Sequence, residues 1–336
     1  MPAPAIEVED LVKVFSPRGR APVRAVDGLS FSVAEGSIFG LLGPNGAGKT
    51  TTLRILTTLA RATSGRATVA AFDVAAAPLE VRRRIAVVIQ EQAADLLLSA
   101  RDNLVAFARF HGLGRATLRR RVDDVLERFG LNEYAGRKVQ DLSGGYRRRV
   151  QVAKIFMVDT PVVFLDEFST GMDPILKRSV MAQLTAEASR GRTIVLTTQV
   201  LSEAEELCDD ILIVNHGRQV ARGDVNTLKL LQQGVYEVTM TFEHLPEGIE
   251  QELAALAPLR LSITGTTVEM AVKEPESRVL ALVSQLSERG RVLRLEVGSA
   301  TLEDIFIELT SPQPRTENRE REPGTGNRDQ GTGGTQ

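Results

Sequence analysis

Eight consecutive residues have the order and composition of a phosphate-binding loop. They are Gly43, Pro44, Asn45, Gly46, Ala47, Gly48, Lys49 and Thr50. Glycine lets the backbone approach phosphate oxygens closely, Lys49 can reach the β- and γ-phosphates, and the Thr50 hydroxyl can bind Mg²⁺. An apolar, strand-like run over 37–42 precedes the loop, and apolar residues recur at helical spacing over 51–59. This order aims backbone N–H groups at one point and predicts a site for a nucleoside triphosphate.

Two carboxylates, Asp166 and Glu167, directly follow a second apolar run at 162–165. In phosphate-loop NTPases a carboxylate at such a strand end helps to hold Mg²⁺, so Asp166 is the expected metal ligand. Glu167 is expected to face the γ-phosphate and to orient or deprotonate the attacking water. A solvent-exposed acidic strand end is the alternative, and the phosphate loop upstream argues against it.

A third motif begins with Ser143, Gly144 and Gly145. Serine is a good N-cap, and the two glycines expose the first N–H groups of a helix predicted from 144 to about 158, which predicts a second anion-binding helix end. Two phosphate-directed sites in one domain suggest that each serves a different nucleotide. A symmetric head-to-tail dimer would place this motif over the partner's γ-phosphate. The arginines at 147–149 are interpreted as a solvated helix face.

The elements around these motifs predict an α/β fold. Alternating strands are expected at 6–15 and 25–33, a strand near 67–71 after a turn at 63–65, and another at 85–89. Helical patterns occupy 100–130, and then strands at 162–165, 193–197 and 211–215 alternate with helices at 174–190 and 201–208. Such alternation implies a parallel sheet covered on both faces. Strands at 235–242, 267–272 and 292–297 with helices at 278–289 and 302–309 predict a small α+β appendage.

Composition excludes several classes of protein. The 336 residues hold 41 basic and 43 acidic side chains, a balance that argues against a general nucleic-acid binder. The single cysteine, Cys208, excludes an internal disulfide and suits a reducing compartment. No apolar stretch approaches the roughly 20 residues that cross a bilayer, and the N-terminus lacks the features of a signal peptide. We therefore expect a cytoplasmic chain that reaches a membrane only through a partner.

The motifs together resemble the nucleotide-binding subunits of ATP-binding cassette (ABC) transporters. The sequence Leu-Ser-Gly-Gly-Tyr at 142–146 is similar to the signature of that superfamily, and the likeness covers roughly residues 6–230. The run Leu-Ser-Gly-Gly-Tyr-Arg-Arg-Arg and the sequence Leu-Glu-Asp-Ile-Phe at 302–306 resemble the ATPase subunits of daunorubicin-resistance-type multidrug exporters, which carry a small domain after the cassette.

The resemblance implies further site residues. Phe15 stands where the family stacks an aromatic ring on adenine, although a buried strand phenylalanine fits equally well. Gln90 matches a glutamine that contacts Mg²⁺ or the water, and Asp173 matches a loop that meets the opposite subunit or caps a helix. Thr51 completes the nucleotide-binding set. Gln199 stands where the family normally has a histidine that contacts the γ-phosphate, and glutamine carries no titratable proton, so we hypothesise slow hydrolysis.

The resemblance also implies an organisation and partners. We expect a phosphate-loop cassette with a mixed sheet, an antiparallel β subdomain and a helical subdomain (about 90–158) over 1–233. A small α+β domain over 234–310 and a disordered tail over 311–336 would follow. Two copies would sandwich two MgATP and drive a separate membrane permease from the inner face of the cell membrane, exporting a drug-like or other hydrophobic cargo. The C-terminal domain would strengthen or regulate dimerisation. A soluble ATPase acting on ribosomes or DNA, and a regulatory subunit that scarcely hydrolyses ATP, remain alternatives.

Overall fold

A six-stranded sheet forms the centre of the computed structural model, which describes residues 4–16, 18–89, 94–230, 235–299, 302–303 and 306–307. Its order is β10-β9-β3-β8-β7-β6, and its strands are β3 (Ile38–Leu42), β6 (Ile85–Val88), β7 (Val162–Asp166), β8 (Thr193–Thr198), β9 (Asp210–Asn215) and β10 (Arg218–Gly223). Strands β3, β6, β7, β8 and β9 are parallel, as predicted, whereas β10 pairs antiparallel with β9. The sequence pattern missed β10 because this edge strand is rich in polar residues and its first three residues are exposed.

Both faces of this sheet are buried, which explains why its strands are continuous apolar runs. In β3, Ile38 and Leu42 pack into one core, while Phe39 and Leu41 pack into the other. All five residues of β3 and of β7 are buried. The carboxyl ends of the parallel strands therefore carry the first residues free to do chemistry.

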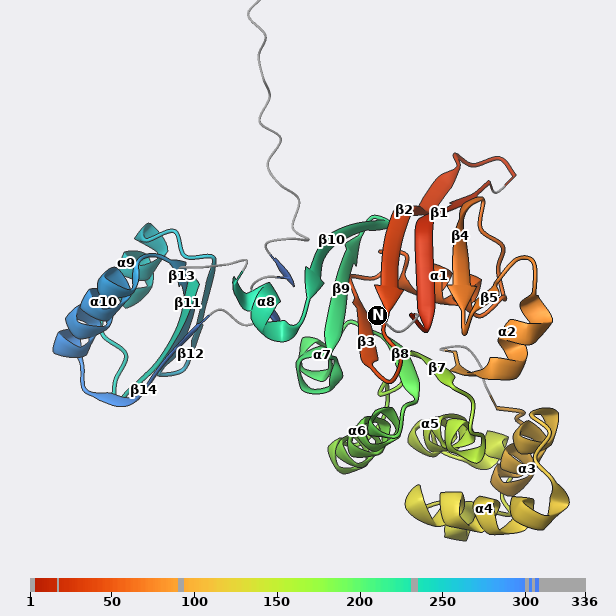
Figure 1. The fold of residues 1–336 in the computed structure, drawn as a ribbon. Coiled ribbons are helices and arrows are strands. Elements are labelled where there is room, and N and C mark those ends of the chain that lie inside the picture. Colours follow the sequence, from red (N-terminus) through yellow and green to blue (C-terminus); the bar gives the residue numbers. More distant parts are fainter. Residues whose placement is uncertain are drawn as a thin grey trace, which may run out of the picture.

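An antiparallel sheet of order β2-β1-β4-β5 covers one face together with α1 (Figure 1). The elements on this side are β1 (Ile6–Phe15), β2 (Val23–Val33), α1 (Lys49–Leu56), β4 (Ser64–Val69), β5 (Phe72–Asp73) and α2 (Pro78–Arg84). The prediction of a turn at 63–65 was partly wrong, because β4 already begins at Ser64. Gly65 there has a φ of +85°, and an added Cβ would lie 2.3 Å from the Asp10 carbonyl oxygen.

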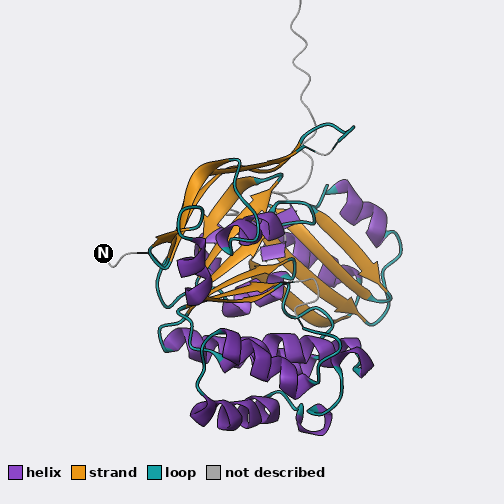
Figure 2. Cartoon of the chain, turned by 90° about the vertical axis from the view of Figure 1, so that its right-hand side faces the viewer, coloured by secondary structure: helices purple, strands orange, loops and turns teal. Residues whose placement is uncertain are grey.

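Helices cover the other face, and Figure 2 shows them gathered beneath the strands. They are α3 (Ala100–Phe110), α4 (Arg115–Arg128), α5 (Gly144–Ala153), α6 (Pro174–Ser189) and α7 (Leu201–Leu207), with the 3₁₀ turns η1 (Asn132–Tyr134), η2 (Val139–Asp141) and η3 (Lys154–Met157). α3, α4, α5 and η3 contact one another and form the helical lobe. No described helix is long and apolar enough to cross a membrane.

After α8 (Val225–Leu230) the chain forms a third sheet of order β12-β13-β11-β14. The elements are β11 (Val235–Phe242), α9 (Ile249–Ala255), β12 (Arg260–Thr264), β13 (Thr267–Lys273), α10 (Glu276–Arg289) and β14 (Val292–Ser299). This βαββαβ order is that of a ferredoxin-like unit, with apolar residues of α9 and α10 in its core. The α+β prediction was correct, although α9 and β12 were missed. The tail predicted to be disordered lies outside the described residues.

The chain then returns to the first unit. Leu302 is buried within the core beneath the central sheet, and its backbone N–H donates to a Glu205 carboxylate oxygen at 3.3 Å. Residues 302–303 and 306–307 are helical, in keeping with the helix predicted over 302–309.

Candidate active site

The phosphate loop joins the carboxyl end of β3 to the start of α1, as the sequence predicted. Gly48 is the N-cap of α1 and has a φ of +105°, and a Cβ there would lie 2.3 Å from the Ala25 carbonyl oxygen. Gly43 is equally confined, since its Cβ would lie 2.3 Å from the Val214 carbonyl oxygen. Asn45 and Gly46 at the tip are exposed, and Thr51 lies in the first turn of α1. The loop is therefore a fixed cradle at a helix N-terminus, where anions are favoured.

The Lys49 ammonium lies inside this cradle. Its Nζ donates to the carbonyl oxygens of Gly43 at 2.7 Å and Pro44 at 3.1 Å. Burial lowers the pKa of Lys49, and the nearby carboxylates of Glu167 and Asp166 oppose that shift. An ammonium has three donors, so a third is left for a phosphate oxygen.

Asp166 ends β7 and meets the loop through Thr50. Its Oδ1 accepts from the Thr50 hydroxyl at 3.2 Å and from the Thr197 hydroxyl at 2.5 Å. Its Oδ2 is buried and has no hydrogen-bond partner among the described residues. An unpaired buried carboxylate oxygen beside a hydroxyl is a costly arrangement in an apolar site, and it suits an oxygen-binding cation such as Mg²⁺. The residues present therefore fit the predicted metal.

Glu167, the next residue, has an unusual backbone. Its φ is +46°, in the left-handed region that non-glycine residues rarely adopt. Its N–H donates to the Thr197 carbonyl at 3.1 Å, and its carbonyl accepts from Arg148 Nη2 at 2.5 Å. Strained conformations of this kind persist where the surroundings hold them, and they gather at functional sites.

Arg148 is the main residue that sequence reasoning missed. It is only 7 % exposed, and its guanidinium also donates to the carbonyls of Asp166 at 2.8 Å and Phe168 at 2.9 Å and more weakly to that of Ile89. The interpretation of 147–149 as a solvated helix face was therefore wrong. A signal was present, because Arg148 lies one helical turn before the buried Val152.

The other two arginines of the run are also engaged. Arg147 donates to the carbonyls of Leu142 at 2.8 Å and Gln140 at 2.9 Å. Arg149 forms an ion pair with Asp173 at 2.6 Å and lies over the Tyr146 ring. The run therefore ties the start of α5 to the loop that precedes α6.

The structure places Ser143 at the N-cap of α5, as predicted, but its side chain makes no capping hydrogen bond. Ser143 and Gly144 are exposed and Gly145 is partly buried, and a Cβ on Gly144 would meet no atom within 4 Å. The first turn of α5 is thus an open helix N-terminus. The Ser143 hydroxyl makes no hydrogen bond to the backbone of α5 that would compete with a bond to a ligand.

Asp173 is the N-cap of α6, as its position before Pro174 predicted. Its carboxylate accepts from the Leu176 N–H at 2.9 Å. This bond, and then the one from Arg149, lowers the pKa of Asp173. The residue thus caps its own helix and anchors α5.

Gln199 is exposed and directly follows β8. The neighbouring turn is fixed by Glu203, which is 1 % exposed, accepts from the Thr198 hydroxyl at 2.9 Å and forms an ion pair with Lys177 at 2.7 Å. This network joins the turn to α6. It holds the backbone of Gln199 while leaving its side chain exposed.

Of two further predicted site residues, the structure describes Phe15 but not Gln90. Phe15 ends β1 and is 44 % exposed, with Lys13 Nζ 5.0 Å from its ring centroid, so the alternative of a buried strand phenylalanine was wrong. Gln90 lies outside the described residues, which stop at Ile89 after β6.

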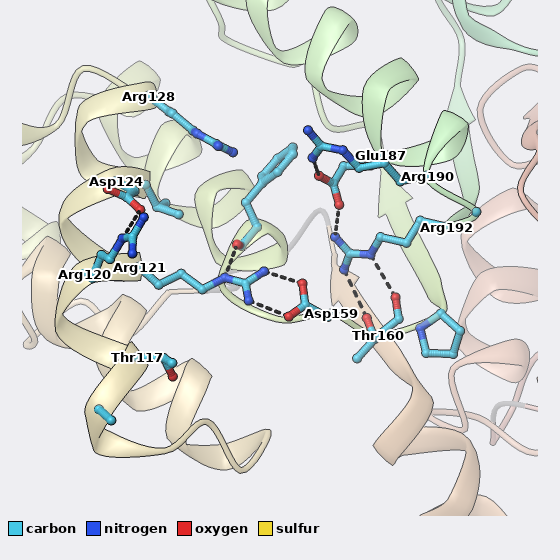
Figure 3. Close-up of a pocket in the computed structure, with 15 residues that line it drawn as sticks. Thr117, Arg120, Arg121, Asp124, Arg128, Asp159, Thr160, Glu187, Arg190 and Arg192 are labelled. Atoms are coloured by element: carbon cyan, nitrogen blue, oxygen red, sulfur yellow. Dashed lines mark hydrogen bonds and ion pairs between the residues drawn. The ribbon is translucent and has the colours of Figure 1, made fainter.

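A pocket of about 680 Å³ lies away from these motifs, between α4 and the segments before β7 and β8 (Figure 3). Arginines line it, but most are committed to pairs. Arg121 pairs with Asp159, and Arg192 donates to Glu187 at 3.0 Å and to the Thr160 carbonyl at 2.8 Å. The pair between Arg121 of α4 and Asp159 joins the helical lobe to the segment before β7.

Comparisons with known proteins identify the family of this chain. A family model described as ABC transporter matches residues 26–170. The chain is 36% identical over 313 residues to the daunorubicin/doxorubicin resistance ATP-binding protein DrrA of Streptomyces peucetius, covering 92% of this chain and 93% of that one. It is also 36% identical to the Nod factor export ATP-binding protein I of Ralstonia nicotianae, covering 93% and 95%.

Solved structures show the same fold. An ATP-binding subunit of an ABC transporter is 26% identical, with a TM-score of 0.62, and the match covers 68% of this chain and 92% of that one. A dimeric ATP-binding cassette in a post-hydrolysis state, bound to ADP and Pi, is 23% identical, with a TM-score of 0.61 over 65% and 98%. The second likeness supports the fold alone. The sequence matches and the geometry of the phosphate loop together show that this chain belongs to the ABC transporter family, as one of its ATP-binding, ATP-hydrolysing subunits.

Proposed function

We propose that two copies of this chain clasp two MgATP molecules head to tail and that hydrolysis drives export through a separate membrane permease. Asp166 carries the proposal, because its unpaired Oδ2 and the Thr50 hydroxyl together form a ready position for the metal of MgATP. Asp166 and Thr50 would hold Mg²⁺, which would supply positive charge to neutralise the phosphates. The relatives named Nod factor export ATP-binding protein I support the direction of transport.

Each protein group has a role in this proposal. Lys49 and the N–H groups of the phosphate loop bind the phosphates, and the exposed Phe15 ring stacks on the adenine. Glu167 orients the water and accepts its proton, while the Thr197 bonds fix the peptide that carries it. The open N-terminus of α5 in the second copy, with Ser143, covers the γ-phosphate. Gln90 contacts the metal or the attacking water. Asp173 belongs to the loop that meets the facing copy.

Motion of the helical lobe would pass the nucleotide state to the permease. Closed and open dimers differ in their affinity for ATP and ADP, so hydrolysis shifts the population between them. The cargo contacts belong to the permease, and the relatives suggest a hydrophobic, drug-like class. The chain would act from the inner face of the cell membrane. We place the cassette at 1–233, its helical part at about 90–158 and the C-terminal domain at 234–310.

A Glu167→Gln chain tests this proposal, because it should bind MgATP without hydrolysing it. We expect it to form a dimer in size-exclusion chromatography with light scattering when MgATP is added, and to need Mg²⁺ for tight binding. Glu167→Gln combined with Ser143→Arg should show no gain in dimer on addition of MgATP under the same conditions. A Glu167→Gln chain that binds ATP fully as a monomer would contradict the clasp.

Gln199 favours one second candidate, a regulatory subunit that binds ATP and scarcely turns it over. Glutamine can donate a hydrogen bond to the γ-phosphate, but it carries no positive charge there. Single-turnover hydrolysis separates the two functions. An active ATPase loses its product formation in Glu167→Gln, whereas a regulatory subunit shows the same trace with either residue.

A further inference from the structure

The edge strand β14 carries apolar side chains that remain exposed. Leu293 is 60 % exposed, Leu295 44 % and Val297 41 %. Leu295 and Val297 lie on the same face of the sheet as the buried residues of β11, because Val297 pairs with Val238 and Leu295 with Met240, whereas Leu293 lies at a register shift and has no partner on β11. Among the described strands β14 pairs with β11 alone, so its other edge presents backbone donors and acceptors.

The side-chain pattern of β14 suits antiparallel pairing with the β14 of a second copy. The order is Leu293, Arg294, Leu295, Glu296, Val297. An antiparallel partner of the same sequence, related by a twofold axis at Leu295, places Leu295 opposite its own copy. Arg294 then lies opposite Glu296, and Val297 lies near the irregularity at Leu293 of the other copy. Opposite charges on one face and apolar pairs on the other are the combinations that stabilise neighbouring strands.

Within one chain the two charges already lie together. Arg294 donates to Glu296 through Nε at 3.0 Å and Nη2 at 2.6 Å, and both side chains are more than half exposed. Self-pairing would give each guanidinium a second carboxylate from across the axis. It would also cover Leu295 and Val297, apolar side chains that a solvated edge strand does not usually display.

We propose that β14 is an interface for a second copy of this chain, which joins two four-stranded sheets into one. An edge of this length buries less than the roughly 1,000 Å² expected of a stable interface, so the contact is weak by itself. It has the twofold symmetry of a head-to-tail cassette dimer. If the proposed function holds, the contact keeps two cassettes at high effective concentration between rounds of ATP binding.

Charge reversal tests the pairing in the full chain without nucleotide. Arg294→Glu and Glu296→Arg each place like charges across the axis, and each should dimerise at least ten-fold more weakly than wild type in sedimentation velocity. The double variant restores both pairs and should dimerise as wild type does. A mixture of the two single variants should form heterodimers, which changes within one chain would not produce. Single variants that associate as wild type does, or a mixture that stays monomeric, would overturn the interface.

A cross-link gives a second measurement. In Leu295→Cys the thiols of two copies would meet at the axis and should form a disulfide-linked dimer on mild oxidation. Ser262→Cys on β12, the opposite edge of the same sheet, is the matched control and should not cross-link. Cys208 gives little background, because it is buried. Equal cross-linking at both positions would refute the proposal. The nucleotide-dependent dimer of Glu167→Gln is measured separately, so failure of one leaves the other standing.

Discussion

Arg148 holds the backbone of Glu167 from the helical lobe. Its Nη2 donates to the Glu167 carbonyl at 2.5 Å, and that residue has a φ of +46°. Left-handed conformations of non-glycine residues cost about 1–3 kcal/mol and need surrounding bonds to persist. The arginine lies in α5, five residues after Ser143, so the helix that presents the signature also positions the carboxylate of its own chain.

Arg148→Gln should therefore lower kcat more than it lowers ATP affinity. Loss of the donors to the carbonyls of Asp166, Glu167 and Phe168 frees the peptide that carries the candidate base, and a displacement of this kind costs roughly 10–100-fold in rate. Steady-state ATPase assays and ATP-binding titrations measure the two effects.

Arg192→Gln is the matched control for this change. Arg192 is 8 % exposed and likewise donates to backbone carbonyls, those of Thr160 and Ile155, but it lies at the far pocket of Figure 3. Both variants should lose about 1–3 kcal/mol of stability through unpaired buried groups. Equal losses of kcat per folded molecule would show that Arg148 has only a structural role.

The chemistry of this site was largely predictable from sequence, whereas its supports were not. The phosphate loop, Asp166 and Glu167 each follow a buried strand, and parallel strands bring their carboxyl ends to one edge. Thr197 and Arg148 act through contacts between segments about 20 to 30 residues apart, which local patterns do not report. The polar β10 was missed because it shows no clear apolar alternation, whereas β12 has the alternating sequence Arg-Leu-Ser-Ile-Thr, a signal that sequence reasoning overlooked.

Thr197→Val should weaken the response to Mg²⁺. The Thr197 hydroxyl bonds Asp166 Oδ1 at 2.5 Å and also accepts from the Glu167 N–H at 3.2 Å, so its loss frees the carboxylate that we assign to the metal. Outer partners of this kind are worth about 10–100-fold in metal affinity. ATPase activity titrated with Mg²⁺ measures the effect, and Thr197→Ser, which keeps the hydroxyl, should stay close to wild type. A normal Mg²⁺ titration in Thr197→Val would remove this role.

Lys154 should make the stability of the chain depend on pH. It is 8 % exposed in η3, and burial lowers its pKa from 10.5 to about 8, against the opposing charge of Asp95. The unfolded chain therefore binds more protons between these values, and stability rises with pH across that window. Relative to Lys154→Met, wild type should gain about 2–3 kcal/mol between pH 7 and pH 10.

Denaturant unfolding at several pH values measures this gain. The exposed Lys138 provides the control, since Lys138→Met should follow wild type at every pH. A constant difference between wild type and Lys154→Met would mean that the ammonium is not desolvated.

Gln199→His should raise the ATPase rate. A histidine at the end of β8 would add a charged donor near the γ-phosphate, and contacts of this class are worth about 2–4 kcal/mol in favourable cases. The Glu203 network is untouched by the change, so the turn should keep its shape. Steady-state rates at saturating MgATP decide the matter, with Gln199→Ala expected to fall below wild type. No gain from histidine would count against slow hydrolysis caused by glutamine.

The most direct measurement mixes two inactive chains. Lys49→Ala removes the phosphate ligand of its own site, and Ser143→Arg blocks the site of its partner. Each site of a head-to-tail dimer combines Lys49 of one copy with Ser143 of the other. In a dimer of one Lys49→Ala copy and one Ser143→Arg copy, both changes therefore fall in the same site, and the second site keeps both natural residues. A 1:1 mixture in which the copies pair at random should therefore recover about a quarter of wild-type ATPase activity, because half the dimers would then be mixed and each mixed dimer has one whole site. Activity that stays at the level of the separate variants would contradict a site shared between two copies.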